Sequence, residues 1–334
     1  MHRNGFSFHC RFVVAVVVVV ATACSSNDAA VDDEAVGVSV EEDAADAIDV
    51  EGSDGDTAPT AEPSEAVASR FLADYQLNDE TFGTSVSVTI ASGQRTIVSN
   101  ALPDHETGEF PNAGNPNAIS AQSQSWTFPL EAVFVGEPAE VRVPGVAVNG
   151  VKFEPGTAET VTCASGETYR VEAIQTLVNL GLDFNNAHVQ PTGEYHYHGI
   201  SELLVEAYAT EDDLVHIGFA ADGHLIYFSK SGAFEPSYEL SPVPRTGVDC
   251  LISLPVGDDP GTLEGTTPDG TYTSDYVFAP AVGDLDECNG AVIEGEYVYL
   301  VTETFPYIAR CLMGDIGGVA GVGGGRAPRP AQDG

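Results

Sequence analysis

The pattern of polar and apolar residues between positions 67 and 314 predicts β-structure. In several segments the two kinds alternate, which places one set of side chains on each face of a strand. These segments are Thr84–Ser92, Ala139–Val148, Glu167–Ile174 and Glu296–Thr302. Turn-forming sequences such as "VNG", "EPG", "DDPG" and "TPDG" lie between such segments. We therefore expect an all-β domain, an antiparallel and sandwich-like fold.

Two further segments have apolar residues near helical spacing and predict minor helices. The first is Ala66–Leu77 and the second is Ser201–Ala209. Neither changes the expected fold class.

Residues 1–23 are typical of an export signal. Basic residues precede an apolar run, Phe12–Ala23, which is shorter than the ~20 residues that span a bilayer. The run ends in "ATAC", which resembles a bacterial lipobox with Ala21 in place of the usual leucine, and so predicts lipidation of Cys24. Cleavage of an ordinary signal peptide after "ATA" is the alternative. We expect an exported protein anchored to a membrane of the cell envelope by lipid, facing the periplasm or the exterior.

The two ends of the chain have compositions that do not predict folded structure. Residues 24–66 are acidic, lack lysine and arginine, and predict a disordered linker after the lipidated cysteine. Residues 315–334 predict a disordered Gly/Pro tail.

The chain is strongly acidic, and this excludes one class of partner. It has 51 Asp and Glu against 12 Lys and Arg, a formal charge of −39. Such a surface repels phosphate backbones, so we expect no binding of nucleic acid. The composition does not decide whether the chain binds a protein or a polymer.

Four cysteines lie in the predicted β domain. In an exported protein they imply two disulfides, for which three pairings exist. We favour Cys288–Cys311, which leaves Cys163–Cys250. A reduced metal-binding cluster is the alternative, but the chain has no Cys-x-x-Cys pair.

Residues 182–200 and 285–302 indicate an internal repeat, and convergent strand-and-turn sequences are the alternative. Both contain Leu-Asp, then Asn four residues after the Leu, then Gly-Glu-Tyr-x-Tyr. The tyrosines of this frame are Tyr195, Tyr197, Tyr297 and Tyr299. The second copy has Ala291, Val298 and Leu300 at the positions of His188, His196 and His198. The tyrosines therefore appear in both copies and indicate a structural role, whereas the histidines indicate an addition to the first copy.

The histidine pair of the first copy predicts a metal site. In a strand, His196 and His198 share one face at ~6.6–7 Å, and their rings could converge on one ion at ~2.0–2.1 Å. His188, in the loop before the strand, is the best further ligand, and His105 is next. Two solvent-facing histidines without a function are the alternative.

Other polar residues are candidates for supporting roles. Asp183 or Glu194 could supply an oxygen ligand, orient a histidine or act as an acid or base. His224 lies at a predicted turn that could approach the site, whereas His216 is expected on a strand surface. With oxidised cysteines and only two methionines, the donors favour a divalent transition metal such as Zn(II), Cu(II) or Fe over Cu(I).

Several blocks of the sequence resemble the YHYH-domain proteins, exported bacterial proteins named for their Tyr-His-Tyr-His motif. The blocks are "NALPDHETGEFPNAGNPNAISAQ", "VNGVKFEPGTAE", "DFNNAHVQPTGEYHYHG", "GFAADGHLIY" and "LDECNG…EGEYVYLVTETFPYIARC". The resemblance covers roughly residues 98–312 and implies an exported domain without an assigned reaction. That family often has histidines in the later block and "DGFPIYG" in its turn. This chain has "GEYVYL" and "DGHLIYF" there, with His224 at a position where an aromatic residue is usual.

The sequence therefore predicts an exported, lipid-anchored protein that binds a divalent transition metal through a His-x-His strand. One alternative is a non-catalytic cell-surface binding module, with the tyrosines and Trp126 as contact surface. Another is a metal-dependent hydrolase or oxidoreductase, although the chain lacks Gly-x-Ser-x-Gly, His-Glu-x-x-His and EF-hand motifs.

Overall fold

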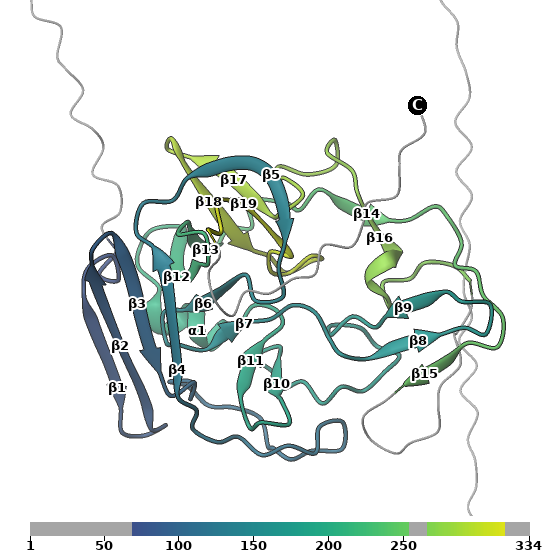
Figure 1. The fold of residues 1–334 in the computed structure, drawn as a ribbon, viewed down its shortest axis with the longest axis horizontal. Coiled ribbons are helices and arrows are strands. Elements are labelled where there is room, and N and C mark those ends of the chain that lie inside the picture. Colours follow the sequence, from purple (N-terminus) through teal and green to yellow (C-terminus); the bar gives the residue numbers. More distant parts are fainter. Residues whose placement is uncertain (1–68, 254–265, 318–334) are drawn as a thin grey trace, which may run out of the picture. The chain divides into compact units, whose positions relative to one another are not determined.

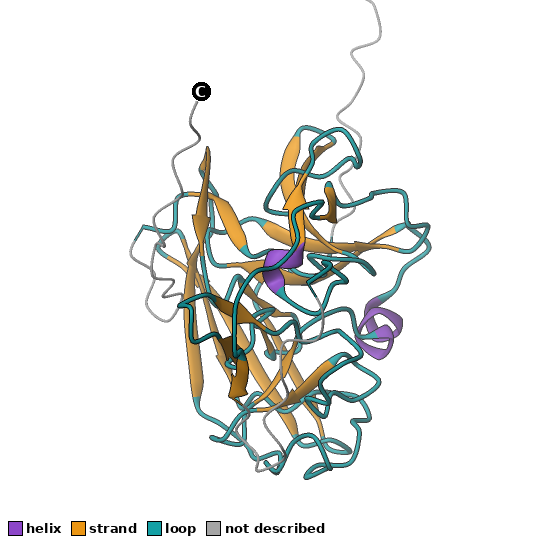
Figure 2. Cartoon of the chain, turned by 90° about the vertical axis from the view of Figure 1, so that its right-hand side faces the viewer, coloured by secondary structure: helices purple, strands orange, loops and turns teal. Residues whose placement is uncertain are grey.

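The fold is that of a computed structural model, in which residues 69–253 and 266–317 are described. These residues form strands and loops with two short helical segments (Figures 1 and 2), so the all-β prediction is confirmed. The predicted signal peptide, the lipidated Cys24, the acidic linker and nearly all of the Gly/Pro tail lie outside the described residues. Within the described ranges, no helix has the length and apolar character needed to cross a membrane.

One layer is a four-stranded antiparallel sheet with the strands in chain order. It contains β1 (Tyr75–Asp79), β2 (Thr84–Ala91), β3 (Gln94–Ser99) and β4 (Gln124–Pro129). The strand predicted over Thr84–Ser92 is confirmed as β2, in which Val86 and Val88 are buried on one face.

The helix predicted over Ala66–Leu77 is wrong in the part that the structure describes. Residues 70–73 form a turn and a bend, and β1 begins at Tyr75. Tyr75 and Leu77 pair with Val88 and Val86 on β2. Strand pairing against an existing sheet outweighs the weak helical spacing of this segment.

The central layer is an eight-stranded sheet in the order β10-β11-β7-β6-β12-β13-β18-β17. Its strands are β6 (Gly145–Ala147), β7 (Lys152–Phe153), β10 (Ala187–Val189), β11 (Tyr195–Tyr197), β12 (Leu214–Ala220), β13 (Leu225–Ser229), β17 (Gly290–Ile293) and β18 (Glu296–Val301). All pairs are antiparallel except β11–β7 and β13–β18. Val86 and Ile97 of the first sheet share one core with Val146 and Phe219 of this sheet, which makes the arrangement sandwich-like.

Smaller elements surround the two layers. They are β5 (Phe134–Glu140) paired with β19 (Cys311–Gly314), β14 (Tyr238–Leu240) paired with β16 (Tyr276–Phe278), the sheet of β15 (Leu251–Ser253), β8 (Thr160–Thr162) and β9 (Thr168–Arg170), the 3₁₀ segment Thr273–Asp275, and α1 (Glu202–Tyr208). The predicted helix at Ser201–Ala209 is confirmed as α1, whose N-cap Ser201 accepts a hydrogen bond from the Leu204 N–H.

Three predicted strands have different outcomes. The strand at Glu296–Thr302 is confirmed as β18. The segment Ala139–Val148 is divided, because β5 ends at Glu140 and β6 begins at Gly145, with Pro144 between them. Of Glu167–Ile174, only Thr168–Arg170 forms a strand.

Both disulfides have the predicted pairing. Cys163 is bonded to Cys250, and Cys288 is bonded to Cys311.

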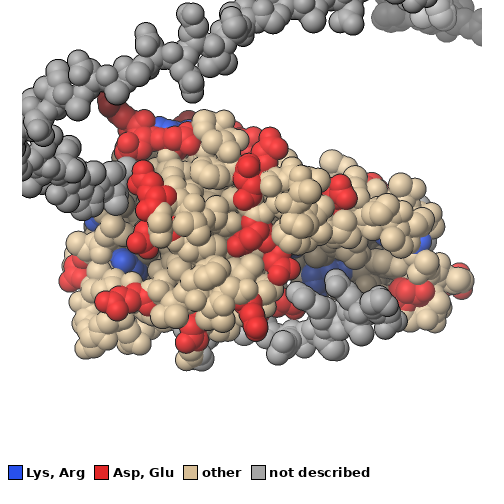
Figure 3. Space-filling model, turned by 90° about the horizontal axis from the view of Figure 1, so that it is seen from above, with Lys and Arg blue, Asp and Glu red and all other residues tan. Residues whose placement is uncertain are grey.

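The face of the molecule shown in Figure 3 carries many acidic and few basic side chains, as the composition predicts.

The eight-stranded sheet consists of two halves with the same pairing pattern. Each copy of the sequence repeat forms a hairpin, β10–β11 in the first and β17–β18 in the second, and from here on each copy also includes the hairpin beside it, β6–β7 for the first and β12–β13 for the second. In each copy a hairpin runs antiparallel, and its second strand lies parallel to the next strand of the sheet.

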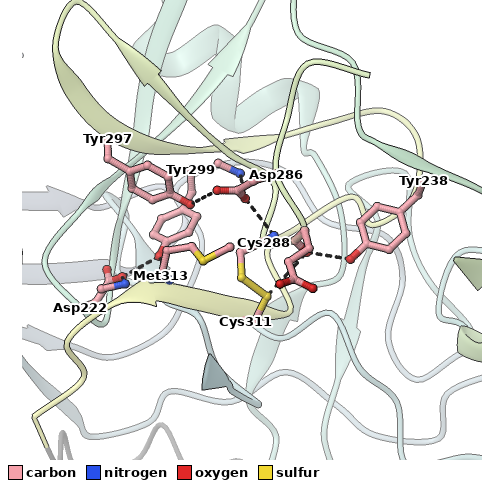
Figure 4. The surroundings of a disulfide bond; sticks show 11 residues. Asp222, Tyr238, Asp286, Cys288, Tyr297, Tyr299, Cys311 and Met313 are labelled. Carbon is pink, nitrogen blue, oxygen red and sulfur yellow. Dashed lines mark hydrogen bonds between the residues drawn. A yellow bond between two sulfur atoms is a disulfide. The ribbon is translucent and has the colours of Figure 1, made fainter. Parts of the chain in front are cut away.

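Hydrogen bonds recur at equivalent positions of the two copies. Tyr195 donates to Asp183 at 2.8 Å, and Tyr297 donates to Asp286 at 2.8 Å. The next tyrosine of each copy contacts the turn residue of the neighbouring hairpin, which is Asn149 for Tyr197 and Asp222 for Tyr299. Figure 4 shows this tyrosine network of the second copy beside the Cys288–Cys311 disulfide.

Candidate metal centre

Three histidines of the first copy meet on one face of the β10–β11 hairpin. His188 lies directly opposite His196 in the antiparallel register, and His198 follows two residues later on the same face as His196. One ring nitrogen of each residue lies within 4.8 Å of the others. The ring centroids are 4.6–4.8 Å apart. We call His188, His196 and His198 the histidine triad.

Two members of the triad are buried and the third is partly exposed. His196 and His198 are 2% and 1% exposed, whereas His188 is partly exposed. His188 is therefore the member of the triad that is nearest to solvent.

Backbone carbonyl oxygens orient all three rings. Nδ1 of His188 lies 2.9 Å from the Leu180 oxygen, and the longer contacts of His196 and His198 reach the oxygens of Glu194 and Pro155 at 3.4 Å. A carbonyl oxygen only accepts hydrogen bonds, so each Nδ1 carries the hydrogen and each Nε2 keeps a lone pair. Nε2 of His198 is buried without a hydrogen-bond partner.

Burial keeps the triad neutral. Desolvation lowers the pKa of His188, and it holds the pKa values of His196 and His198 well below the ordinary histidine value. The neighbouring imidazoles lower the pKa of His196 and His198 further, because adjacent positive charges repel. At neutral pH the rings therefore present lone pairs, the form that binds metal.

The donor set fits a transition metal ion. Three imidazoles around a tetrahedral ion place their nitrogens about 3.4 Å apart, so nitrogens that lie within 4.8 Å would close by at most about 1.4 Å. Nitrogen donors of this kind suit zinc, copper, iron and nickel. The partner-free Nε2 of His198 is the atom that such an ion would satisfy.

A buried ionic network adjoins the triad. Lys152 of β7 is the register partner of His196 in the parallel β11–β7 pair. Its ammonium lies 2.8 Å from Glu154, 3.0 Å from Glu194 and 3.0 Å from the Gln190 amide oxygen. Sequence analysis missed Lys152, Glu154 and Gln190, although Lys152 is one of only two lysines and lies between the apolar residues Val151 and Phe153.

His105, the fourth predicted ligand, is not brought into the triad. Its Nε2 lies 2.6 Å from the Tyr197 hydroxyl and its Nδ1 lies 2.9 Å from the Glu106 oxygen. Both ring nitrogens are therefore engaged. Tyr197 alternates with His196 along the strand, so His105 lies on the tyrosine face of β11, away from the triad.

The residues expected to support the site have separate places. Asp183 accepts hydrogen bonds from Tyr195 and from the Gly108 N–H, and so anchors the hairpin. Glu194 contributes its backbone oxygen to His196 and its carboxylate to Lys152. The Asp183 and Glu194 carboxylates are not among the ligand atoms that cluster within 4.8 Å.

Two other histidines lie outside the triad. His224 belongs to the second copy, where its Nδ1 donates to the Tyr297 oxygen at 2.8 Å and its Nε2 is buried without a partner. The expectation that His216 lies on a strand surface is wrong, because the residue is only 6% exposed. A hydrogen bond to Ser69 and another to the Gly218 oxygen satisfy both of its nitrogens.

The second copy shows what the same part of the fold contains without the triad. Its counterparts Ala291, Val298 and Leu300 pack with Leu285, Tyr227 and Phe234 in a separate apolar cluster. The register also places Leu225 where the first copy has Lys152. The hairpin therefore folds with apolar residues at the positions of the triad.

The residues offered as a contact surface by the binding-module alternative are buried. Trp126 is 8% exposed, and Tyr195 and Tyr197 are fully buried. Their contribution is to the core rather than to a surface.

Comparison with protein families identifies the domain. The family model described as YHYH protein matches residues 125–314. The chain belongs to the YHYH protein family. None of the curated proteins and none of the solved structures compared with it matches. The matched range of this YHYH protein contains the whole eight-stranded sheet and the triad, and it excludes His105.

Proposed function

We propose that this YHYH protein binds one divalent transition metal ion through Nε2 of His188, His196 and His198. The observation that carries the proposal is the cluster of three oriented, neutral imidazoles, one of which has a buried nitrogen without a partner. A tetrahedral ion would have a fourth position for water or a small ligand.

The comparison between the two copies supports a functional origin of the triad. Burying a polar group without a hydrogen bond costs about 1–3 kcal/mol in proteins. The second copy avoids this cost with alanine, valine and leucine at the same positions. Histidines at positions that the fold can fill with apolar residues therefore indicate a ligand.

Two observations support an exported, lipid-anchored protein. The paired disulfides are typical of oxidising compartments. The "ATAC" sequence places Cys24 where a bacterial lipoprotein carries its lipid. Metabolic labelling with a fatty-acid analogue tests the anchor, because Cys24→Ala would lose the label if the cysteine is lipidated.

The metal proposal is tested by measuring stoichiometry. The purified protein is stripped with a chelator, dialysed against Zn²⁺, Cu²⁺ or Fe²⁺, and analysed by elemental mass spectrometry. We expect one ion per chain. A wild-type protein without stoichiometric metal would contradict the proposal and favour a binding module.

The second copy supplies the matched variant. His188→Ala with His196→Val and His198→Leu gives the first copy the residues of the second. We expect this triple variant to bind no metal and, in metal-free buffer, to unfold at an equal or higher urea concentration. His224→Gln, which changes the buried histidine of the second copy, is the control and should keep the metal. Equal metal in the triple variant would remove the triad from the proposal.

A further inference from the structure

We infer that Lys152 determines the metal specificity of the triad by holding two carboxylates, those of Glu154 and Glu194, away from the bound ion. The inference rests on the proposed metal site. Lys152 acts through these two residues and is therefore a positioning residue rather than a ligand.

Both carboxylates are immediate neighbours of the triad. Glu194 lies two residues before His196 and so points to the same face of the hairpin. Glu154 directly follows Phe153, which pairs with Tyr197, so Glu154 lies across from His198 on the adjacent strand. Both are buried, at 4% exposed for Glu154 and 6% for Glu194.

The Lys152 ammonium holds both carboxylates. One oxygen of Glu154 lies 2.8 Å from the ammonium and the other lies 2.8 Å from Arg142. Glu194 binds the ammonium at 3.0 Å with one oxygen and accepts from Gln124 at 2.8 Å with the other. Each carboxylate oxygen is therefore engaged, and neither residue joins the cluster of ligand atoms.

The network also fixes the hairpin that carries the triad. Gln190 and Glu194 flank its turn, and the ammonium contacts the side chains of both. The register equivalents of Lys152 and Glu154 in the second copy are Leu225 and Tyr227. The fold therefore does not require an ammonium at this position, and a buried ion pair is seldom a net gain in stability.

The consequence is a site with nitrogen donors only. Imidazole suits zinc, copper, iron and nickel, whereas carboxylate oxygens suit manganese and magnesium. Without the ammonium, Glu154 would keep its ion pair with Arg142, whereas Glu194 would keep only its hydrogen bond from Gln124. A nearby cation would then attract these buried carboxylates. The triad would then become a mixed nitrogen–oxygen site.

The test compares metal preference in wild type and Lys152→Met. We expect Lys152→Met to bind Mn²⁺ about tenfold more tightly than wild type does, since partners beside a metal site change affinity by about 10–100-fold. The electron paramagnetic resonance spectrum of bound Cu²⁺ should change from nitrogen-only to mixed nitrogen–oxygen coordination. The variant Lys152→Arg, which keeps the positive charge, should have the same Cu²⁺ spectrum as wild type. Adding Glu154→Gln and Glu194→Gln to Lys152→Met should abolish the gain in Mn²⁺ affinity.

The outcomes separate this inference from the proposed function. Wild type that binds no metal overturns both. Wild type that binds metal, together with a Lys152→Met variant whose Cu²⁺ spectrum and Mn²⁺ affinity are unchanged, overturns only the role of Lys152. If Lys152→Met does not fold, the double variant Lys152→Leu with Glu154→Tyr replaces it, because these are the residues of the second copy. In this double variant Glu194 is the carboxylate that has lost the ammonium. The same Mn²⁺ titration then shows whether Lys152 affects metal preference.

Discussion

The hydroxyl oxygen of Tyr197 lies 2.6 Å from Nε2 of His105, on the face of β11 opposite the histidine triad. The same strand therefore carries the triad on one side and a buried tyrosine–histidine pair on the other. Asn149 also donates to the Tyr197 hydroxyl at 2.9 Å, so the tyrosine uses His105 as the acceptor of its own hydrogen.

His105→Ala should lower stability without removing metal. The buried Tyr197 hydroxyl loses its acceptor, which should reduce the free energy of unfolding by about 1–3 kcal/mol in urea denaturation. The double-mutant cycle with Tyr197→Phe should give a coupling energy of about 0.5–3 kcal/mol. Loss of the metal ion from His105→Ala would show that His105 is a ligand after all.

The matched tyrosines of the two copies allow a comparison within one molecule. Tyr195→Phe and Tyr297→Phe each remove a 2.8 Å hydrogen bond to a carboxylate. Each should cost about 1–3 kcal/mol of unfolding free energy. Only Tyr195→Phe should also weaken Zn²⁺ binding, by about tenfold, because Asp183 anchors the hairpin that carries the triad. Equal Zn²⁺ affinity in the two variants would show that this anchor has no effect on the site.

Much of the fold could be predicted from residue periodicity. Alternation is clear where one face of a strand is buried and the other exposed, as in β2. The helix predicted at Ala66–Leu77 failed because the partner strand of β1 is not visible in a local pattern. His216 was misplaced for a similar reason, since six of the seven residues of β12 are buried and the strand therefore has no exposed face.

Residue periodicity also predicted part of the candidate metal site, namely the three histidines of the triad. A period of two places His196 and His198 on one face, and the hairpin brings His188 opposite. A local sequence pattern does not show which face of a strand a distant loop contacts. His105 was therefore predicted to join the histidine face of β11, whereas it lies on the tyrosine face. Lys152 was missed because a parallel strand pair, which no local pattern reveals, places it beside His196.

The two disulfides should differ in their contribution to stability. The Cys163–Cys250 bond closes a sequence separation of 87 residues and the Cys288–Cys311 bond closes one of 23. Loop-closure entropy predicts that the longer loop stabilises the protein by about 1 kcal/mol more. Urea unfolding of Cys163→Ala/Cys250→Ala and of Cys288→Ala/Cys311→Ala checks the order. A larger loss for the second pair would show that packing around Cys288, which is fully buried, outweighs chain entropy.

His216 should make stability depend on pH below neutrality. Burial, with a smaller effect from the Arg95 charge, lowers its pKa from 6.5 to about 3 in the folded protein. Between these values the unfolded chain binds a proton that the folded protein does not, so unfolding becomes easier as pH falls. Above pH 6.5 the His216 ring is neutral in both the folded and the unfolded protein, so its full contribution to the free energy of unfolding is present.

The variant His216→Gln isolates this effect, because glutamine does not titrate and keeps an amide donor for the Gly218 oxygen. Wild type should lose about 1.4 kcal/mol more unfolding free energy per pH unit than His216→Gln does between about pH 6 and pH 4. The triad and the carboxylates are present in both proteins, so their titration cancels in the difference. Urea denaturation of the metal-free proteins across this range provides the measurement. Parallel pH profiles would mean that the His216 ring takes up its proton in the folded state, in conflict with the burial that lowers its pKa.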